Sequence, residues 1–367
     1  MMTEARGETM KATVVEEPKA SSPAPLSSLS LREVPRPKVG DYDVLCELLY
    51  GATCTATDLH IIEGSFPFPV DYPTILGHES IGRAVEVGSK VRHFQLGDLI
   101  TRVGAPPLTL EEEKGESQKL NVNWGGFAQY GIAKDHWAMR RDGLPSEEWN
   151  GYRVNQPLPS GIGPAEATMV ITWRETLSYV TRMGLGEGKE ERSLIVGSGG
   201  VGLSFLNHAR NLGLEKVVMI GNVGREALAR KVGATDFFNY KDEALTDKLE
   251  ESYPGGFDFI IDAVGKKGEA DKVLPLLKRG GTIGIYGIDD LGGNSLTPAR
   301  SRGSFTYYND HYDEEESHHR VVSQMRAGKL KAQHWLNLES PFPLEDMERA
   351  FRTVKKRKEV KALIELS

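Results

Sequence analysis

The stretch LIVGSGGVG, residues 194–202, decides the fold of this chain. Its first three residues are apolar and mostly β-branched, which is typical of a buried strand. The strand runs into glycines spaced G-x-G-x-x-G, and apolar residues continue at helical spacing as far as Ala209. A strand, a glycine turn and a helix in this order indicate the opening of a dinucleotide-binding βαβ unit.

Each glycine has its own role in such a turn. Gly197 permits the tight turn, Gly199 lets backbone N–H groups approach a pyrophosphate, and Gly202 lets the helix pack against the strand. The helix begins near Gly200 and Val201, where the N–H donors of the first turn and a partial positive charge suit phosphates. These five residues are predicted to bind the cofactor. The alternative is a strand–helix turn that holds no ligand.

Strands and helices alternate after residue 160. A helix is predicted over 165–183, further strands over 216–220, 257–262 and 281–287, and further helices over 225–232 and 270–277. This rhythm predicts βαβ units. The fold class is therefore α/β, with a doubly wound parallel sheet and helices on both of its faces.

The first 160 residues have a different pattern, in which short strands are separated by Gly and Pro. The strands are predicted over 10–15, 44–50, 80–87, 98–103 and 126–131. Their regular turn signals predict a barrel-like β domain. The polar segment 105–124 is predicted to be a loop or an excursion from that barrel, and residues 1–9 a disordered extension.

Composition excludes several classes of function. The formal net charge is −7 and the one basic run, 355–358, is typical of a solvated helix end, so no nucleic-acid partner is expected. No apolar stretch has the length of a membrane span or the place of a signal core, so no membrane partner is expected. The two cysteines, Cys46 and Cys54, cannot form a disulfide framework or a four-cysteine zinc site, and they fit a cytoplasmic protein.

Two motifs outside the cofactor turn carry a family resemblance: Thr57-Asp58-Leu59-His60 and Gly77-His78-Glu79. Together with Gly125-Gly126-Phe127-Ala128 and Gly233-Ala234-Thr235, they make the chain resemble the medium-chain dehydrogenase/reductase superfamily of zinc alcohol and polyol dehydrogenases. The resemblance covers nearly the whole chain from residue 10. It implies a Rossmann-type doubly wound parallel sheet plus a GroES-like β-barrel catalytic domain, with the active site in the cleft.

The resemblance also implies an order of domains. A catalytic domain is expected over 10–165, a Rossmann cofactor domain over 166–303, and a return to the catalytic domain over 304–367. Members of this superfamily are often dimers or tetramers, so a homodimer or homotetramer is expected.

The metal ligands are only partly present. The resemblance makes His78 a zinc ligand and Glu79 the adjacent acid that sometimes joins the metal. The family's first cysteine ligand falls on Thr55, and Cys54 lies one residue early, where a side chain is expected to point elsewhere. The last ligand falls on Ile171, one helical turn before Glu175. Two alternatives stay open: an unusual site that uses Cys54 or Glu175, and a lost metal site. No structural zinc is expected.

Three residues of the first motif are predicted to be catalytic. Thr57 and His60 match the family's proton relay, which passes from a hydroxyl through the cofactor ribose to a histidine near the surface. Asp58 resembles the family's buried acid, whose basic partner from the final strand falls on Lys361. That lysine is also expected to reach the cofactor pyrophosphate. The alternative for His60 is an exposed loop residue.

The end of the strand over 216–220 bears on the choice of cofactor. NAD-specific members place an acid there for the ribose hydroxyls, whereas this chain continues Gly221-Asn222-Val223-Gly224-Arg225. Gly221 makes room for a 2′-phosphate and Arg225 can pair with it, so NADP is favoured over NAD. Asn222 still suits a plain ribose.

The sequence thus predicts an NAD(P)-dependent alcohol dehydrogenase/carbonyl reductase. Hydride moves between nicotinamide and a small alcohol, a polyol or its carbonyl, with zinc assistance if the metal site exists. The alternatives are a zinc-free carbonyl or alkene reductase on the same fold and a non-enzymatic NADPH-binding protein. Aromatic residues that could line a substrate pocket are Phe66, Phe68, Trp124, Phe127 and Trp173.

Overall fold

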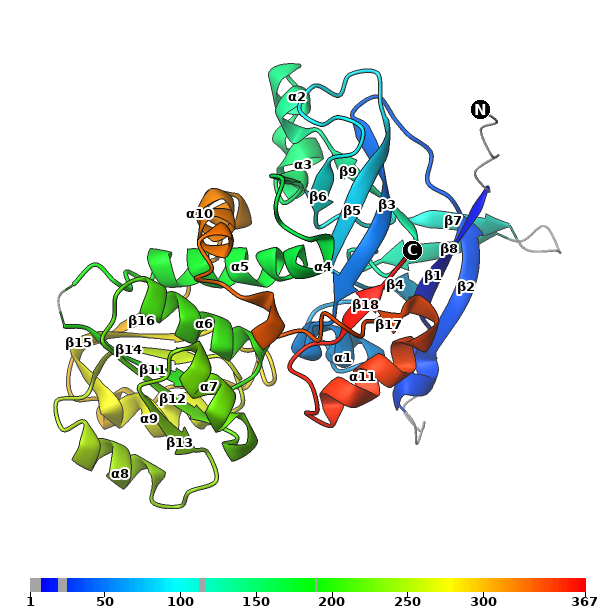
Figure 1. Cartoon of the computed structure of the whole chain (residues 1–367). Coiled ribbons are helices and arrows are strands. Elements are labelled where there is room, and N and C mark those ends of the chain that lie inside the picture. Colours follow the sequence, from blue (N-terminus) through cyan, green and yellow to red (C-terminus); the bar gives the residue numbers. More distant parts are fainter. Residues whose placement is uncertain (1–7, 19–24, 112–116, 189) are drawn as a thin grey trace. The chain divides into compact units, whose positions relative to one another are not determined.

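The computed structural model describes residues 8–18, 25–111, 117–188 and 190–367. The chain divides into two compact units (Figure 1). One comprises the described residues up to Ile171 together with Val322–Ser367, and the other comprises Thr172–Val321. The second unit thus begins later than residue 166 and continues beyond residue 303.

The later end of the second unit has a structural cause. Strand β16 (Thr306–Tyr308) pairs in parallel with β15 (Leu277–Ile285), which keeps this segment with the cofactor-domain sheet. The first turn of helix α10 (Glu314–Arg326) is then joined to α5 (Met169–Arg182) by the buried pair Arg174–Glu314, 2.7 Å between Nη2 and Oε2.

The second unit is built on one parallel sheet of six strands in the order β13-β12-β11-β14-β15-β16. Every neighbouring pair in it is parallel. The strands not yet given are β11 (Arg192–Val196), β12 (Lys216–Gly221), β13 (Asp236–Asn239) and β14 (Phe257–Asp262). In chain order the arrangement is 3-2-1-4-5-6, the doubly wound order of a Rossmann sheet.

Helices follow these strands in alternation, as the sequence predicts. They are α6 (Gly200–Asn211), α7 (Glu226–Val232), α8 (Leu245–Ser252) and α9 (Glu269–Val273). Leu194 and Val218 from the central strands join Ile260 and Ile283 in one buried apolar cluster, so the β-branched runs form the core.

The first unit contains two sheets. Strands β2-β1-β4-β8-β7 form one, and β10-β6-β5-β3-β18-β17 form the other, with β9 paired to β3. Their bounds are β1 (Thr9–Val15), β2 (Leu29–Pro35), β3 (Asp43–Ala52), β4 (Thr74–Ile75), β5 (Glu79–Val87), β6 (Leu99–Thr101), β7 (Leu108–Glu111), β8 (Ser117–Val122), β9 (Tyr130–Lys134), β10 (Pro157–Leu158), β17 (Phe342–Pro343) and β18 (Leu363–Glu365).

Three local expectations need correction. Segment 105–124 is not simply a loop, because β7 and β8 pair within it. The predicted strand 126–131 begins only at Tyr130, since Gly126 lies tight against Gly77. Residues 1–7 of the expected N-terminal extension lie outside the described residues, but Thr9 already pairs with Pro35.

Strand pairing in the first unit also brings distant parts of the sequence together. Ala52, the last residue of β3, lies opposite Glu79 of β5 and opposite Leu363 of β18. Cys54 follows Ala52 by two residues, and Lys361 precedes Leu363 by two. The register of the central strands therefore gathers three polar residues at one end of the sheet. Within the described part of the chain, no helix is long and apolar enough to cross a membrane.

Candidate functional site

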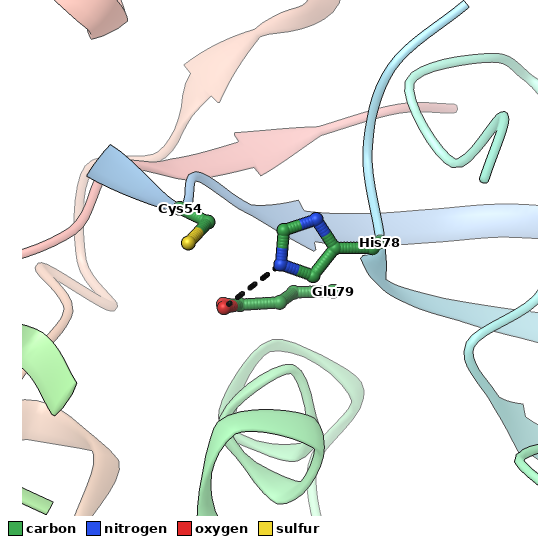
Figure 2. Close-up of side chains that lie close together, drawn as sticks. All are labelled: Cys54, His78 and Glu79. Atoms are coloured by element: carbon green, nitrogen blue, oxygen red, sulfur yellow. Dashed lines mark ion pairs between the residues drawn. The ribbon is translucent and has the colours of Figure 1, made fainter. Parts of the chain in front are cut away.

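Cys54, His78 and Glu79 form a compact cluster in the first unit. One ligand atom from each, a sulfur, a nitrogen and an oxygen, lies within 4.8 Å of the other two. Figure 2 shows the three side chains pointing toward one another. His78 and Glu79 are buried, and Cys54 is half-buried.

The position of Cys54 differs from the sequence expectation. It is the N-cap of helix α1 (Thr55–Glu63), with extended backbone angles φ −100° and ψ 110°. Thr55, at the family's usual ligand position, is the first residue of the helix and is exposed. The extended residue just before the helix thus brings its thiol to His78, although it lies one residue early.

His78 is held by neighbours on several sides. Gly77 has φ 99°, and a Cβ there would lie 2.6 Å from the backbone nitrogen of Phe127, so only glycine fits before the histidine. The His78 ring packs 4.9 Å from the Trp124 ring, centroid to centroid. Its Nδ1 lies 3.8 Å from Asp58 Oδ1, and its Nε2 lies 3.7 Å from Glu79 Oε1.

The electrostatic environment keeps His78 neutral. Burial, with the charges of Arg102 and Lys361, holds the pKa of His78 well below its usual value of 6.5. Neutral imidazole is the form that ligates a metal. Asp58 accepts a hydrogen bond from the Cys54 backbone N–H at 2.8 Å, and burial raises the pKa of its carboxyl to about 7.

The partner of Lys361 is Glu79. Its Nζ lies 2.5 and 2.6 Å from the two carboxylate oxygens of Glu79 and donates to the Thr53 carbonyl at 3.2 Å. Burial opposes the charge of Lys361, but Glu79, Cys54 and Asp58 together raise the pKa of the ammonium. The structure thus pairs the lysine with Glu79 where the sequence expectation is Asp58. Lys361 is only 3% exposed, and its Nζ already has these three contacts. The expected contact of Lys361 with the cofactor pyrophosphate therefore remains a prediction.

The donors of the cluster fit zinc. A thiolate, an imidazole and a carboxylate are the ligand types that zinc takes in proteins, and a catalytic site needs three of them. Burial raises the pKa of the Cys54 thiol to about 11, so a bound metal would have to displace its proton. Ile171 is fully buried in an apolar cluster. Glu175 belongs to the other unit, where it accepts a hydrogen bond from the Tyr286 hydroxyl at 3.3 Å.

The relay residues lie on helix α1. Thr57 Oγ1 lies 3.6 Å from Cys54 Sγ, which connects the relay hydroxyl with the cluster. His60 follows three residues later, on the same side of the helix, and its Nδ1 lies 2.8 Å from Ser65 Oγ. Thr57 is half-buried, and so is His60.

The glycine turn of the second unit forms an open cradle. A Cβ on Gly202 would lie 1.9 Å from the Gly197 carbonyl oxygen, so the helix packs against the turn only with glycine there. A Cβ on Gly199 would meet no atom within 4 Å. Gly199 is also the N-cap of α6, which has no side-chain cap, and Gly200 and Val201 lie in the first turn of the helix. The cradle fits a pyrophosphate.

The end of β12 carries the residues expected at the ribose. Asn222 accepts a hydrogen bond from the Gly224 N–H at 2.9 Å and caps the short turn Val223–Arg225. Its own N–H donates to Ser198 Oγ at 3.0 Å, which connects this turn to the glycine turn. Sequence reasoning missed Ser198. Strand β12 ends at Gly221 and is followed by Asn222, so no acidic residue stands at its end.

The fold and the two sites define a two-domain, nucleotide-dependent dehydrogenase. Residues 40–145 match the family model for the alcohol dehydrogenase GroES-like domain, and residues 200–311 match the model for zinc-binding dehydrogenases. The chain belongs to the medium-chain dehydrogenase/reductase superfamily and is an NAD(P)-dependent oxidoreductase of the alcohol dehydrogenase class.

Relatives agree with this assignment, and a solved structure shares the fold. The chain is 28% identical over 294 residues to an alcohol dehydrogenase of Geobacillus stearothermophilus, covering 76% of this chain and 77% of that protein. It is 29% identical over 281 residues to an NADP-dependent isopropanol dehydrogenase of Clostridium beijerinckii, covering 74% and 77%. The fold matches that of benzyl alcohol dehydrogenase from Acinetobacter calcoaceticus, with a TM-score of 0.78 at 16% identity, covering 98% and 99% of the two chains.

Proposed function

We propose that this protein moves hydride between NADP(H) and a small alcohol or its carbonyl, with a zinc ion held by Cys54, His78 and Glu79. The observation that carries the proposal is the gathering of these three ligand atoms within 4.8 Å, with Thr57 Oγ1 3.6 Å from the sulfur. When bound, zinc supplies a Lewis acid that polarises the substrate oxygen.

The chain's own residues hold and move the proton. Thr57 accepts the proton of the substrate hydroxyl during oxidation and gives up its own hydroxyl proton to the next group of the relay, since a hydroxyl can both accept and donate. His60 then passes a proton to solvent, because an imidazole has one nitrogen that can accept a proton and one that can donate it. Its Nδ1 lies 2.8 Å from Ser65 Oγ, and this contact orients the ring.

NADP is the proposed cofactor. The glycine cradle suits the pyrophosphate of either dinucleotide, but the end of β12 offers Asn222 and Arg225 and no acid that would repel a 2′-phosphate. The relative from Clostridium beijerinckii is NADP-dependent by name. We further propose that the protein binds no structural zinc, since Cys46 and Cys54 are its only cysteines and such a site needs four. We also propose that it forms a homodimer or homotetramer, as is common in the superfamily.

The second candidate function is a zinc-free reductase of activated carbonyls or alkenes. One observation favours it: Lys361 Nζ lies within 2.6 Å of both carboxylate oxygens of Glu79. A carboxylate held in this way is a weaker metal ligand until the lysine contact opens. Thr57 would then be the proton donor to the reduced substrate.

The deciding experiment measures metal content and turnover in the same untagged preparation. We expect about one zinc ion per chain by mass spectrometry, alcohol oxidation with NADP⁺, and loss of turnover on chelation that zinc restores. Thr57→Val should lower kcat in the loaded enzyme, whereas Thr57→Ser should retain most of it. Metal-free protein with undiminished turnover of ketones or enones would establish the zinc-free candidate instead.

A further inference from the structure

Trp124 has an unusual backbone and an unusual exposure. It is one of the non-glycine residues with a left-handed backbone, at φ 72°. Such a conformation costs about 1–3 kcal/mol and persists where the surrounding structure imposes it, often at functional sites. The residue is 41% exposed, whereas Phe127, three residues later, is fully buried. A strained backbone here presents a large aromatic ring to solvent.

The inner side of this ring lies against the candidate metal site. The centroids of the Trp124 and His78 rings are 4.9 Å apart, with an angle of 56° between the ring planes. His78 itself is buried, so the tryptophan covers one side of the proposed ligand and leaves the rest of its own surface exposed. Ligand pockets are lined mainly by apolar and aromatic side chains, so an exposed aromatic surface next to a candidate reaction centre is suited to contact a substrate.

The loop that carries Trp124 is tightly fixed. A Cβ on Gly104 would lie 1.7 Å from the Trp124 carbonyl oxygen, and a Cβ on Gly125 would lie 2.3 Å from the Ala105 carbonyl oxygen. The Gly126 N–H donates to the Gly77 carbonyl at 2.7 Å, which joins the loop to the residue before His78. The backbone that carries the ring is therefore held close to His78.

A second strained residue lies against the same ring. Arg102 has φ 56°, and its guanidinium carbon lies 6.0 Å from the centre of the Trp124 ring. Asn155, which is 2% exposed, donates to the Arg102 carbonyl at 3.0 Å and to the Thr101 carbonyl at 3.2 Å. Arg102 and Trp124 thus both have a left-handed backbone, and the side chain of the first lies near the ring of the second.

We infer that Trp124 forms a wall of the substrate pocket and makes the enzyme prefer alcohols and carbonyls with an aromatic ring next to the reactive carbon. The inference rests on the proposed function, because it takes the Cys54–His78–Glu79 cluster as the reaction centre. A flat ring stacks on tryptophan with a gain beyond apolar area alone. Branched aliphatic alcohols and open-chain polyols lack such a face.

The test compares three alcohols with NADP⁺: benzyl alcohol, cyclohexylmethanol and isopropanol. In Trp124→Leu, we expect the ratio of kcat/KM for benzyl alcohol over isopropanol to fall about 3- to 10-fold, and cyclohexylmethanol to lose less than benzyl alcohol. Trp124→Phe should keep most of the ratio. An equal loss for all three alcohols, or no loss, would overturn the inference, because it would leave Trp124 as a support for His78 only.

A matched control is available in the same unit. The ring of Trp149 is half-buried and has the Arg140 guanidinium carbon 5.7 Å from its centre, so it resembles Trp124 in its cation contact. It lies in the short helix α3 (Ser146–Trp149) and donates to the Leu144 carbonyl. Trp149→Phe should leave the substrate ratio unchanged.

A binding measurement separates this inference from the proposed function. Saturation-transfer NMR with benzyl alcohol should show contact with the wild-type protein and a clear loss of contact in Trp124→Leu. If the wild type oxidises none of the alcohols but Trp124→Leu loses the NMR contact, the proposed function fails and the substrate preference fails with it, while Trp124 still binds an aromatic ring. If alcohols are oxidised and the NMR contact persists in Trp124→Leu, the wall is refuted and the function stands.

Discussion

Lys361 Nζ lies 2.5 Å from Glu79 Oε1, and both residues are almost fully buried at one end of the central sheet. The pair joins the final strand region to the start of β5, across 282 residues of sequence. It sets the charge balance of the candidate metal site, because Glu79 also faces His78 Nε2 at 3.7 Å. The consequences can be measured in stability and in metal affinity.

Removal of the lysine should destabilise the protein strongly. Lys361→Met leaves the Glu79 carboxylate buried without its cation, and breaking a buried pair from one side costs about 3–5 kcal/mol. The free energy of unfolding in urea measures this loss. The double variant K361M/E79Q should recover part of it, because no charge is then left unpaired.

The control for this prediction is an exposed lysine in an ion pair of similar length. Lys355 Nζ lies 2.6 Å from Glu63 Oε1 at the surface. Lys355→Met should cost at most about 1 kcal/mol. Equal losses in the two single variants would mean that the buried pair contributes no more than a surface one.

Cys54 should decide zinc affinity. Cys54→Ser replaces the soft thiolate by a hydroxyl, which zinc holds far less well, so we expect affinity to fall by at least about 100-fold. Competition with a chromogenic chelator measures this without turnover. Cys46→Ala is the control, since Cys46 is fully buried in β3 and lies outside the cluster. If Cys54→Ser bound zinc as tightly as the wild type, Cys54 would not be a zinc ligand.

The fold follows from local signals in the sequence. The β-branched run before Gly197 predicts β11, and the alternation of strands and helices predicts the parallel sheet. Such patterns are short-range, so a single sequence carries them. The hairpin of β7 and β8 is different: Leu108, Leu110 and Leu120 pack on the apolar core, but they stand among polar residues in a short segment, and β8 pairs with the distant β4.

The site depends on long-range register, which local patterns do not contain. Cys54 reaches His78 because Ala52 pairs with Glu79, and Lys361 arrives there because Ala52 also pairs with Leu363. The aromatic residues that the sequence offers as pocket walls could not be sorted from local patterns either. Phe127 and Trp173 are fully buried, whereas Trp124 is partly exposed beside His78. Side-chain type alone does not distinguish a core ring from a pocket wall.

Two glycines of the cofactor turn should respond oppositely to alanine. In Gly199→Ala, the new Cβ meets no protein atom, so the free energy of unfolding should change by less than about 0.5 kcal/mol. NADPH affinity should fall about tenfold or more, because the methyl group occupies the space left for the pyrophosphate. Fluorescence titration with NADPH measures this effect.

Gly202→Ala provides the contrast. Its Cβ would lie 1.9 Å from the Gly197 carbonyl oxygen, so α6 must shift and unfolding should become easier by about 1–3 kcal/mol. If Gly199→Ala binds NADPH as tightly as the wild type, the cradle at Gly199 does not hold the pyrophosphate.

Acid stability should depend on His208, which lies fully buried in α6 with Nε2 3.0 Å from Thr176 Oγ1. Burial lowers the pKa of its imidazole to about 3. The unfolded chain takes up a proton on this group below its ordinary pKa of about 6.5, whereas the folded chain does not. Because the unfolded state binds more protons, stability falls as the pH drops from about 6.5 toward 3.

The expected size at pH 4.5 is about 2–3 kcal/mol relative to pH 7.5, since each pH unit below the unfolded pKa costs about 1.4 kcal/mol. His208→Gln cannot be protonated and keeps an amide for Thr176, so its unfolding free energy should decline less between these two pH values. His311→Gln is the control, because His311 is exposed. Parallel pH profiles for the wild type and His208→Gln would show that this histidine does not limit acid stability.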